Sequence, residues 1–250
     1  MSSEPSQRRR DAALLGQTLV VIGGSAGIGL ATAVHARAAG ASVILTGRDP
    51  ERLRTAAAEA CALSTAAFDA HDPKELQQFF QEAPDPLDHV LITAGQPSYG
   101  RLLDLDAEQA RRAISDHMVL ALEVARHAVG RLRPGGTLVL LGGTGGRRIR
   151  AGLGSVSVVT AAMPAFTAAL ALELAPVRVN LIAAGFVDTP LSAQLLGEGL
   201  DARRAELRDT LPIGRVVVPD DVASLAVHIM ANTALTGATY DIDGGQQLLG

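Results

Sequence analysis

Short apolar stretches alternate with longer stretches of helical periodicity along the whole chain. The apolar stretches are rich in β-branched residues and leucine: Thr18–Ile22, Ser42–Thr46, Thr65–Phe68, His89–Thr93, Thr137–Leu141, Arg178–Ala183 and Thr239–Ile242. Runs of this kind are typical of strands buried on both faces of a parallel sheet. Between them we expect helices over Ile28–Ala39, Glu51–Ala60, Pro73–Gln81, Ala107–Leu132, Ala161–Leu174 and Asp220–Met230. The alternation predicts an α/β fold, a doubly wound sheet of seven parallel strands with helices on both faces.

The chain is long enough for one full hydrophobic core. It has 250 residues, of which 48% are hydrophobic, and no internal repeat or dividing linker. We therefore expect a single domain over residues 13–250, preceded by a flexible N-terminal tail over residues 1–12. Three arginines, Arg8 to Arg10, precede the first apolar stretch, but Asp11 interrupts any resemblance to an export signal.

Composition excludes several classes of function. The net charge of −4 and the pI of about 5.9 leave no electrostatic basis for binding nucleic acid. The single cysteine, Cys61, cannot form an internal disulfide, which favours a cytoplasmic protein. No uninterrupted apolar run approaches the roughly 18 residues of a membrane span, so we expect no membrane partner. The histidines lack metal-ligand spacing, and we expect no metal site.

A glycine-rich turn follows the first predicted strand and opens the first predicted helix. Gly23, Gly27 and Gly29 are spaced Gly-x-x-x-Gly-x-Gly within Val21–Leu30. Glycines let the backbone approach a pyrophosphate closely, and the helix N-terminus offers unpaired N–H groups and a positive dipole end. The arrangement predicts a Rossmann-like dinucleotide site, with the ligand outside the carboxyl ends of the strands.

Several motifs together resemble the short-chain dehydrogenase/reductase family, from about residue 16 to residue 246. The motifs are Ile22-Gly-Gly-Ser-Ala-Gly-Ile-Gly29, Thr93-Ala-Gly95, Leu172–Asn180, Ala184–Pro190 and Tyr240–Gln246. The resemblance implies that Asp69 contacts the adenine ring and that Thr189 hydrogen-bonds the nicotinamide carboxamide. With the glycine turn, it assigns cofactor contacts to Gly23, Ser25, Gly27, Ile28, Gly29, Asp69, Ala94, Gly95 and Thr189. It also implies a specificity loop over about residues 191–211, whose leucines suggest an apolar lid.

The second predicted strand ends with a positive charge instead of an acid. Gly47 stands where an NAD-dependent enzyme would carry its acid, and Arg48 follows directly. A guanidinium can form a bidentate, charge-assisted pair with a 2′-phosphate, whereas an acid there would repel one. We therefore favour NADP(H) over NAD(H) as the cofactor. Asp49, the next residue, is the argument for NAD(H).

The resemblance fails at the catalytic positions. The family uses a tyrosine, a lysine four residues later, a serine and an asparagine, and alignment places Val156, Thr160, Gly143 and His117 there. The chain has one lysine, Lys74, and its two tyrosines lie elsewhere, so no Tyr-x-x-x-Lys exists. A phenol that titrates near 10 needs an adjacent cation to transfer a proton near neutral pH. We expect a degenerate active site, and Pro164 predicts a kink or a late start, near Met163, of the helix that carries it.

Two other side chains are candidates for the proton transfer. His117 occupies the relay position, and imidazole titrates near neutral pH without help from a lysine. Tyr99 lies in the loop after the fourth strand, close to the expected substrate entrance. The alternatives are a core histidine and a loop-packing tyrosine. Three arginines, Arg147, Arg148 and Arg150, either capture an acidic group of the substrate or form a solvated loop.

These observations leave two hypotheses for the function. The first is an NADP(H)-dependent oxidoreductase with an atypical site, acting on an unidentified small carbonyl or alcohol substrate. The second is a non-catalytic NADP(H)-binding sensor or structural subunit, which the fourfold replacement supports. The apolar helices Ala107–Leu132 and Ala161–Leu172 correspond to surfaces that pair subunits in relatives, and we expect a homodimer or homotetramer.

Overall fold

The computed structural model, which describes residues 13–97 and 99–249, is built on a parallel sheet of seven strands. The strands are β1 (Thr18–Ile22), β2 (Ser42–Gly47), β3 (Ser64–Ala67), β4 (Leu87–Ile92), β5 (Leu132–Gly143), β6 (Arg178–Ala184) and β7 (Thr239–Ile242). Their order in the sheet is β3-β2-β1-β4-β5-β6-β7, and every neighbouring pair is parallel. The predicted α/β doubly wound fold in a single domain is confirmed. The predicted tail over residues 1–12 lies outside the described residues.

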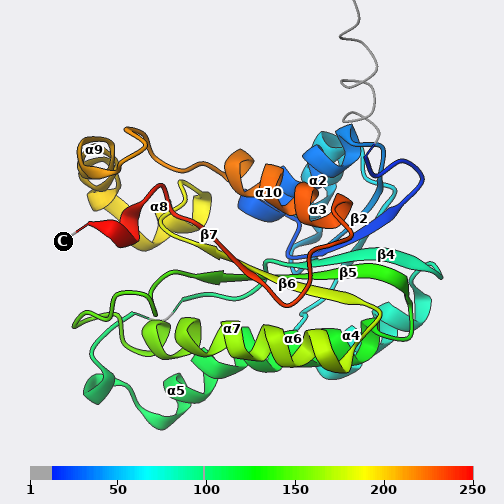
Figure 1. Cartoon of the computed structure of the whole chain (residues 1–250), viewed down its shortest axis with the longest axis horizontal. Coiled ribbons are helices and arrows are strands. Elements are labelled where there is room, and N and C mark those ends of the chain that lie inside the picture. The colour runs from blue at the N-terminus through cyan, green and yellow to red at the C-terminus, as the bar shows by residue number, and fades with distance from the viewer. Residues whose placement is uncertain (1–12, 98, 250) are drawn as a thin grey trace, which may run out of the picture.

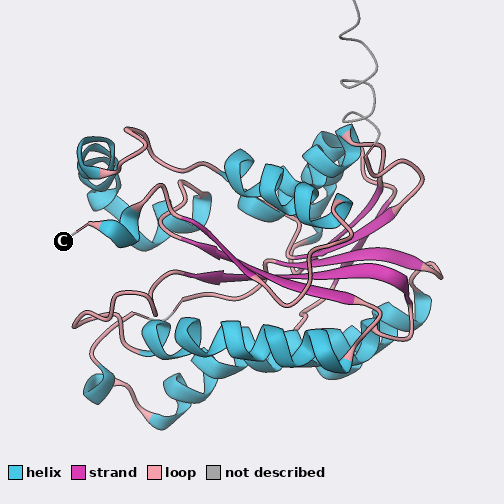
Figure 2. Cartoon of the chain, viewed as in Figure 1, coloured by secondary structure: helices cyan, strands magenta, loops and turns pink. Residues whose placement is uncertain are grey.

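Helices cover both faces of this sheet (Figures 1 and 2). The longer ones are α2 (Gly27–Ala38), α3 (Pro50–Ala60), α4 (Pro73–Glu82), α5 (Ala107–Ile114), α6 (Leu120–Ala128), α7 (Ser155–Glu173), α9 (Leu200–Thr210) and α10 (Pro219–Ala231). One layer holds α2, α3 and α10, and the other holds α4, α6 and α7 (Figure 1). Asp49 and Asp72 start α3 and α4 by accepting hydrogen bonds from backbone N–H groups of the first turn.

The core is divided by the sheet into two apolar clusters. One packs Phe80, Val124 and Met163 of the lower helices against the sheet, and the other packs Ala33 and Ile229 of the upper helices against its opposite face. All six residues of β4, at the centre of the sheet, are buried. This two-sided burial explains why the strands read as continuous apolar runs in the sequence.

Two helix predictions were wrong in their bounds. The helix expected over Ala107–Leu132 is broken by a π-helical segment, Ser115–Val119, and ends at Ala128, because Leu132 already begins β5. The helix expected to start late, near Met163, begins at Ser155 and runs through Pro164. Met163, Thr167 and Leu170 of α7 are buried, and this packing outweighs the backbone donor that the proline lacks.

One described helix, α7, is long and apolar enough to cross a membrane by length and composition alone. It lies along the sheet beside β5 and β6, and Val159, Met163 and Leu170 join the core cluster on that face. A core helix of a globular domain passes the same test. Its position in the fold accounts for its composition without a membrane.

The chain order reverses between β2, β1 and β4, which places a crevice at the carboxyl ends of these strands. Two further segments lie at that edge, next to the ends of β6 and β7: the short helix α8 (Pro190–Leu196) and α9, joined by a 3₁₀ turn over Gly197–Gly199 (Figure 1). They form most of the segment expected to be the specificity loop. The fold therefore places the glycine turn and this segment at one edge.

Candidate functional site

A cleft of about 800 Å³ runs along the carboxyl ends of β1, β2 and β4. All ten residues that the sequence assigns to the cofactor line it: Gly23, Ser25, Gly27, Ile28, Gly29, Arg48, Asp69, Ala94, Gly95 and Thr189. They come from five separate stretches of the chain. The doubly wound topology brings these stretches to one cleft.

The backbone of the glycine turn is packed so closely that it leaves no space for side chains at Gly23 and Gly29. Gly23 has a φ of +99°, and a Cβ there would lie 2.7 Å from the backbone nitrogen of Ala94. A Cβ on Gly29 would overlap the carbonyl oxygen of Gly23. No side chain caps α2, and its first turn carries no acid, so backbone N–H groups at its start are left for a ligand. These features fit a pyrophosphate between the turn and the helix.

The far end of the cleft carries positive charge. Arg48 lines it, together with Arg52 and His71, which the sequence reasoning missed. Arg52 lies one helical turn after Arg48, and that spacing was the available signal. The carboxylate of Asp49 accepts hydrogen bonds from the backbone nitrogens of Glu51 and Arg52, at 2.9 and 3.1 Å. Asp49 therefore serves as the cap of α3, and its charge is engaged there.

Asp69 lines the same end of the cleft in an ionised state. Its carboxylate accepts a hydrogen bond of 3.0 Å from the backbone nitrogen of His71. This bond, more than the charges of His71 and Arg48, holds the pKa of Asp69 below its usual value against the opposing effect of burial. The carboxylate is a hydrogen-bond acceptor at this end of the cleft.

A second cavity, of about 230 Å³, adjoins the first. It brings together the four aligned catalytic positions, His117, Gly143, Val156 and Thr160, and it also includes Tyr99. Ile28, Thr93, Ala94, Gly95, Leu141, Thr189 and Leu191 line both cavities. Most of the lining is apolar, and among the described residues it contains no Asp, Glu, Lys or Arg. The cavity suits a largely apolar molecule.

Several hydroxyl groups of this cavity already donate their hydrogens to backbone carbonyls. The Oγ1 of Thr160 donates to the carbonyl of Val156 at 2.6 Å, and the Oγ of Ser192 donates to the carbonyl of Thr189 at 2.8 Å. The Oγ1 of Thr93 donates to the carbonyl of Gly23 at 2.9 Å. A hydroxyl has one hydrogen, so these three groups act toward a ligand as acceptors.

His117 lies in the π-helical segment Ser115–Val119, on the wall of the cavity. Such segments are frequent at functional sites because they re-aim a side chain from a regular helix. Its Nδ1 lies 3.3 Å from the carbonyl oxygen of Ala113. A carbonyl only accepts, so Nδ1 carries a hydrogen and Nε2 is left to exchange a proton with a ligand.

Tyr99 also lines the cavity, but its phenol holds its proton tightly. Burial raises the pKa of Tyr99, and the positive charge of Arg203 offsets only part of that effect. Arg203 belongs to α9, and its charge acts on Tyr99, a relation that no local pattern in the sequence reveals.

The loop after β5 packs tightly against α7. A Cβ on Gly146 would lie 2.5 Å from the backbone nitrogen of Ala161, and one on Gly143 would lie 3.3 Å from Cγ2 of Thr160. Arg147, considered above for substrate capture, forms an ion pair of 3.0 Å with Asp241. Its charge is therefore partly neutralised within the chain.

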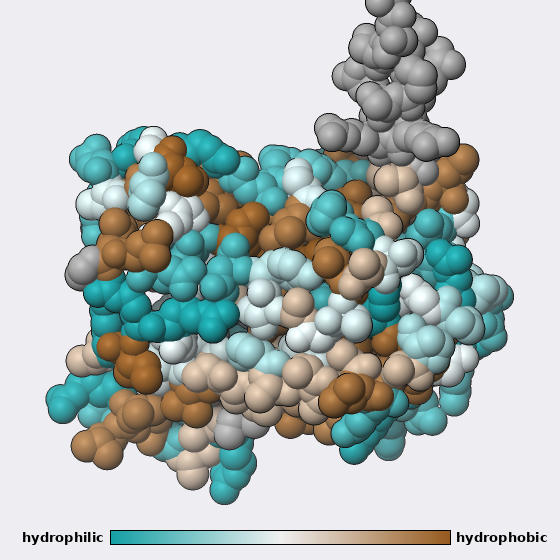
Figure 3. Space-filling view, in the orientation of Figure 1, coloured by the Kyte–Doolittle hydropathy of each residue, from teal (hydrophilic) through white to brown (hydrophobic). Residues whose placement is uncertain are grey.

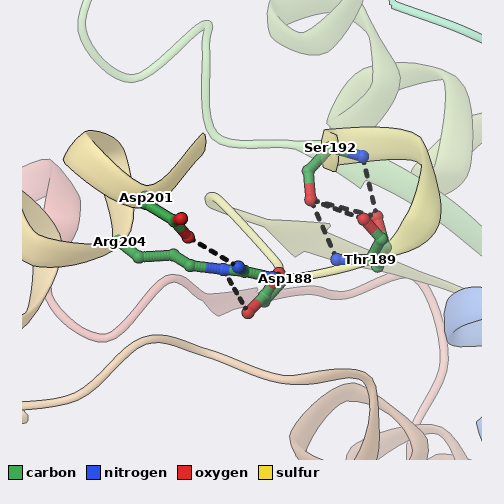
Figure 4. A network of polar contacts seen from close by, with 5 residues as sticks. All are labelled: Asp188, Thr189, Ser192, Asp201 and Arg204. Atoms are coloured by element: carbon green, nitrogen blue, oxygen red, sulfur yellow. Dashed lines mark hydrogen bonds and ion pairs between the residues drawn. The ribbon is translucent and has the colours of Figure 1, made fainter. Parts of the chain in front are cut away.

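An arginine on α9 anchors the lid segment to the end of β6. The Nε and Nη2 of Arg204 donate to the carboxylate of Asp188 at 2.9 and 2.8 Å, and its Nη1 donates to Asp201 at 3.0 Å. Figure 4 shows this network. The residue after Asp188, Thr189, starts α8: its Oγ1 accepts from the backbone nitrogen of Ser192 at 3.1 Å. The bidentate pair fixes α9 beside the cleft.

Within the described part of the chain, no group of three or more His, Cys, Asp or Glu side chains could hold a metal ion.

Comparison with known proteins gives the same picture. The family profile described as "Enoyl-(Acyl carrier protein) reductase" matches residues 23–247. The chain is 29% identical to Short-chain dehydrogenase/reductase ATR9 of Stachybotrys chlorohalonatus, covering 92% of this chain and 96% of that protein. It is 28% identical to Carbonyl reductase family member 4 of Xenopus tropicalis, covering 91% and 97%. A crystal structure of a small-chain dehydrogenase in complex with NADPH superposes with a TM-score of 0.80 at 28% identity, covering 93% and 99%.

Proposed function

We propose that this chain, which belongs to the short-chain dehydrogenase/reductase family, is an NADP(H)-dependent oxidoreductase with an atypical active site. Its substrate is a small carbonyl or alcohol compound. The observation that carries the proposal is the position of His117, the group on the cavity wall best suited to exchange a proton near neutral pH.

The residues of the cleft fit the cofactor. The uncapped start of α2 and the glycine turn would hold the pyrophosphate, Arg48 and Arg52 the 2′-phosphate, and Thr189 the carboxamide. The capping role of Asp49, whose Oδ1 accepts from two backbone nitrogens of α3, supports NADP(H) over NAD(H). When bound, the nicotinamide supplies or accepts the hydride.

The protein's own task is to orient the substrate and move one proton. In carbonyl reduction the protonated imidazole of His117 donates from Nε2 to the developing alkoxide, and in alcohol oxidation the neutral imidazole accepts that proton. The engaged hydroxyl of Thr160 cannot serve as the donor. The Tyr99 phenol, with its raised pKa, is a poorer donor near neutral pH. Gly143, Val156 and Thr160 leave room in place of the family's serine, tyrosine and lysine.

A fluorescence titration with NADPH and NADH, followed by a turnover screen with carbonyl compounds, tests the proposal. The chain has no tryptophan, so its own emission interferes little with the nicotinamide signal. Preferential binding of NADPH together with carbonyl-dependent NADPH oxidation supports it. NADPH binding without turnover of any carbonyl or alcohol would point instead to the non-catalytic sensor or structural subunit, and binding of neither nucleotide would contradict both.

Replacement of Arg48 by glutamine is expected to raise the Kd for NADPH about tenfold or more, because a charge-assisted pair with the 2′-phosphate is lost. The Kd for NADH should stay within about twofold, since NADH lacks that phosphate. The variant Arg54→Gln is a matched control, because Arg54 lies on α3 and pairs with Glu51 at the surface. Equal weakening of NADPH and NADH by R48Q would contradict the assignment of Arg48.

We also propose that the exposed face of α7 pairs two copies of the chain in a homodimer or homotetramer. Val158 and Leu172 are 58% and 83% exposed, and brown and tan surface gathers over α7 in Figure 3. Light scattering at micromolar concentration should give a mass of two or four chains. Leu172→Glu should lower that mass, whereas Leu63→Glu, which changes an exposed leucine near β3, should not. A monomeric mass for the unaltered protein would overturn the proposal.

A further inference from the structure

A cation lies beside the largely apolar wall of the second cavity. Phe186 and Tyr99 line the cavity, and the guanidinium carbon of Arg203 lies 6.0 Å from the centre of the Phe186 ring. The charge of Arg203 also reaches Tyr99, the other aromatic residue of the cavity. Arg203 therefore lies beside the ring of Phe186, a side chain of the wall, although it belongs to the separate helix α9.

The position of this cation is held by its neighbours in the fold. The adjacent residue, Arg204, is fixed to Asp188 by the bidentate pair, which anchors α9 to the end of β6. The guanidinium also lies at cation–π distance from the Phe186 ring, which favours this position of the charge. Arg203 is 30% exposed, so it is accessible to a molecule that enters the cavity and is partly shielded from bulk water.

Arg203 already binds a carboxylate of its own helix. Its Nη1 lies 2.7 Å from Oε2 of Glu206, which is 57% exposed. A partly exposed ion pair one helical turn apart contributes little to stability. Glu206 is thus an easily displaced carboxylate, and an incoming acid can take its place on the guanidinium.

Building on the proposed function, we propose that the substrate is an oxo acid or hydroxy acid, with an apolar body in the cavity and its carboxylate on Arg203. The planar guanidinium matches a carboxylate in a bidentate pair. Arg203 then determines specificity, because it lies beside Phe186 of the wall and the lining itself contains no Asp, Glu, Lys or Arg among the described residues. The other arginines considered for this role include Arg147, which is paired with Asp241.

The kinetic test compares levulinate and longer straight-chain oxo acids with their methyl esters in NADPH-dependent reduction. We expect kcat/KM to favour the acids about tenfold or more, and R203Q to remove the preference by raising KM for the acids alone. Arg208→Gln, an exposed change on the same helix, should leave the preference intact. Glu206→Gln should strengthen it, because it frees the guanidinium from its resident carboxylate. An equal or greater kcat/KM for the esters overturns the inference while the proposed function stands.

A calorimetric titration with octanoate and octanamide gives a readout that needs no turnover. We expect octanoate to bind more tightly than octanamide to the NADP⁺-saturated protein, and R203Q to bind both equally. This result supports the acid site even if no carbonyl compound is reduced, in which case the proposed function fails by itself. Equal binding of the two probes to the unaltered protein, or no binding of octanoate, overturns the inference.

Discussion

Acidification below about pH 6.5 is expected to lower the free energy of unfolding by about 1.4 kcal/mol per pH unit through one buried histidine, His89. Desolvation by burial, more than the nearby charges of Arg178 and Arg133, lowers the pKa of His89 to about 3. The unfolded chain takes up a proton below about pH 6.5, which the folded protein does not do until about pH 3. The stabilisation is therefore fully present above pH 6.5 and is lost as the pH falls, by about 5 kcal/mol in total.

The surroundings of His89 explain why it stays neutral. The residue is 1% exposed, and its Nε2 lies 2.5 Å from Oε1 of Gln17, which accepts its hydrogen. Across the sheet, Thr137 lies next to His89 in register and Arg178 lies next to Thr137. The Arg178 guanidinium donates to five backbone carbonyls, those of Gly135, Ile229, Met230, Asn232 and Leu235. A second positive charge beside it would be poorly compensated.

The measurement is urea unfolding of the protein and of the variant His89→Gln at several pH values between 7 and 4.5. The glutamine was chosen because its amide can still donate a hydrogen bond to Gln17. Carboxylates add their own pH dependence to both proteins, so the difference between the two slopes isolates His89. The exposed His228 provides the control, His228→Gln. Parallel slopes for H89Q and the unaltered protein would contradict the expected titration.

The inner strands β1, β2, β4, β5 and β6 were predictable because most of their residues are buried, so the sheet sets their apolar pattern. The edge strands β3 and β7 are more exposed, and they were recognised by their place in the alternation of strands and helices. The cofactor cleft was predictable for a related reason. The glycine turn between β1 and α2 is encoded by a short stretch of consecutive residues, which a sequence motif can reveal. Gly23 and Gly29 have to be glycines because neighbouring backbone atoms leave no space for a Cβ. Parallel topology then brings Asp69, Ala94 and Thr189 to the same edge.

The substrate side was less predictable because its shape depends on tertiary contacts. The π-helical segment at His117 leaves no mark in the apolar periodicity, which continues from α5 into α6. The β-branched residues near Val156 and the internal Pro164 argued for a late helix start, yet burial of the α7 face keeps the helix intact from Ser155. Arg203 lies some hundred residues from Tyr99 in the chain, and only the folded structure relates them.

Replacement of His117 by alanine is expected to lower kcat for carbonyl reduction about 10²–10⁴-fold, the contribution of a well-placed general acid. KM and the Kd for NADPH should change by no more than about threefold, because the imidazole acts on the proton in the transition state and the cofactor cleft keeps its lining. His228→Ala, which removes an exposed imidazole on α10, is the matched control.

The pH profile separates proton transfer from a purely structural role of His117. Reduction needs the protonated imidazole and should slow as the pH rises through the range in which imidazoles titrate, whereas alcohol oxidation needs the neutral form and should accelerate. Both dependences should disappear in H117A, and added imidazole should restore part of its activity, since the alanine leaves space at the cavity wall. A His117→Ala variant that keeps its kcat and its pH profile would exclude the histidine. Tyr99 would then be the remaining candidate for the proton donor. Because burial raises the pKa of Tyr99, replacing it by a tyrosine analogue with a more acidic phenol should then increase the activity.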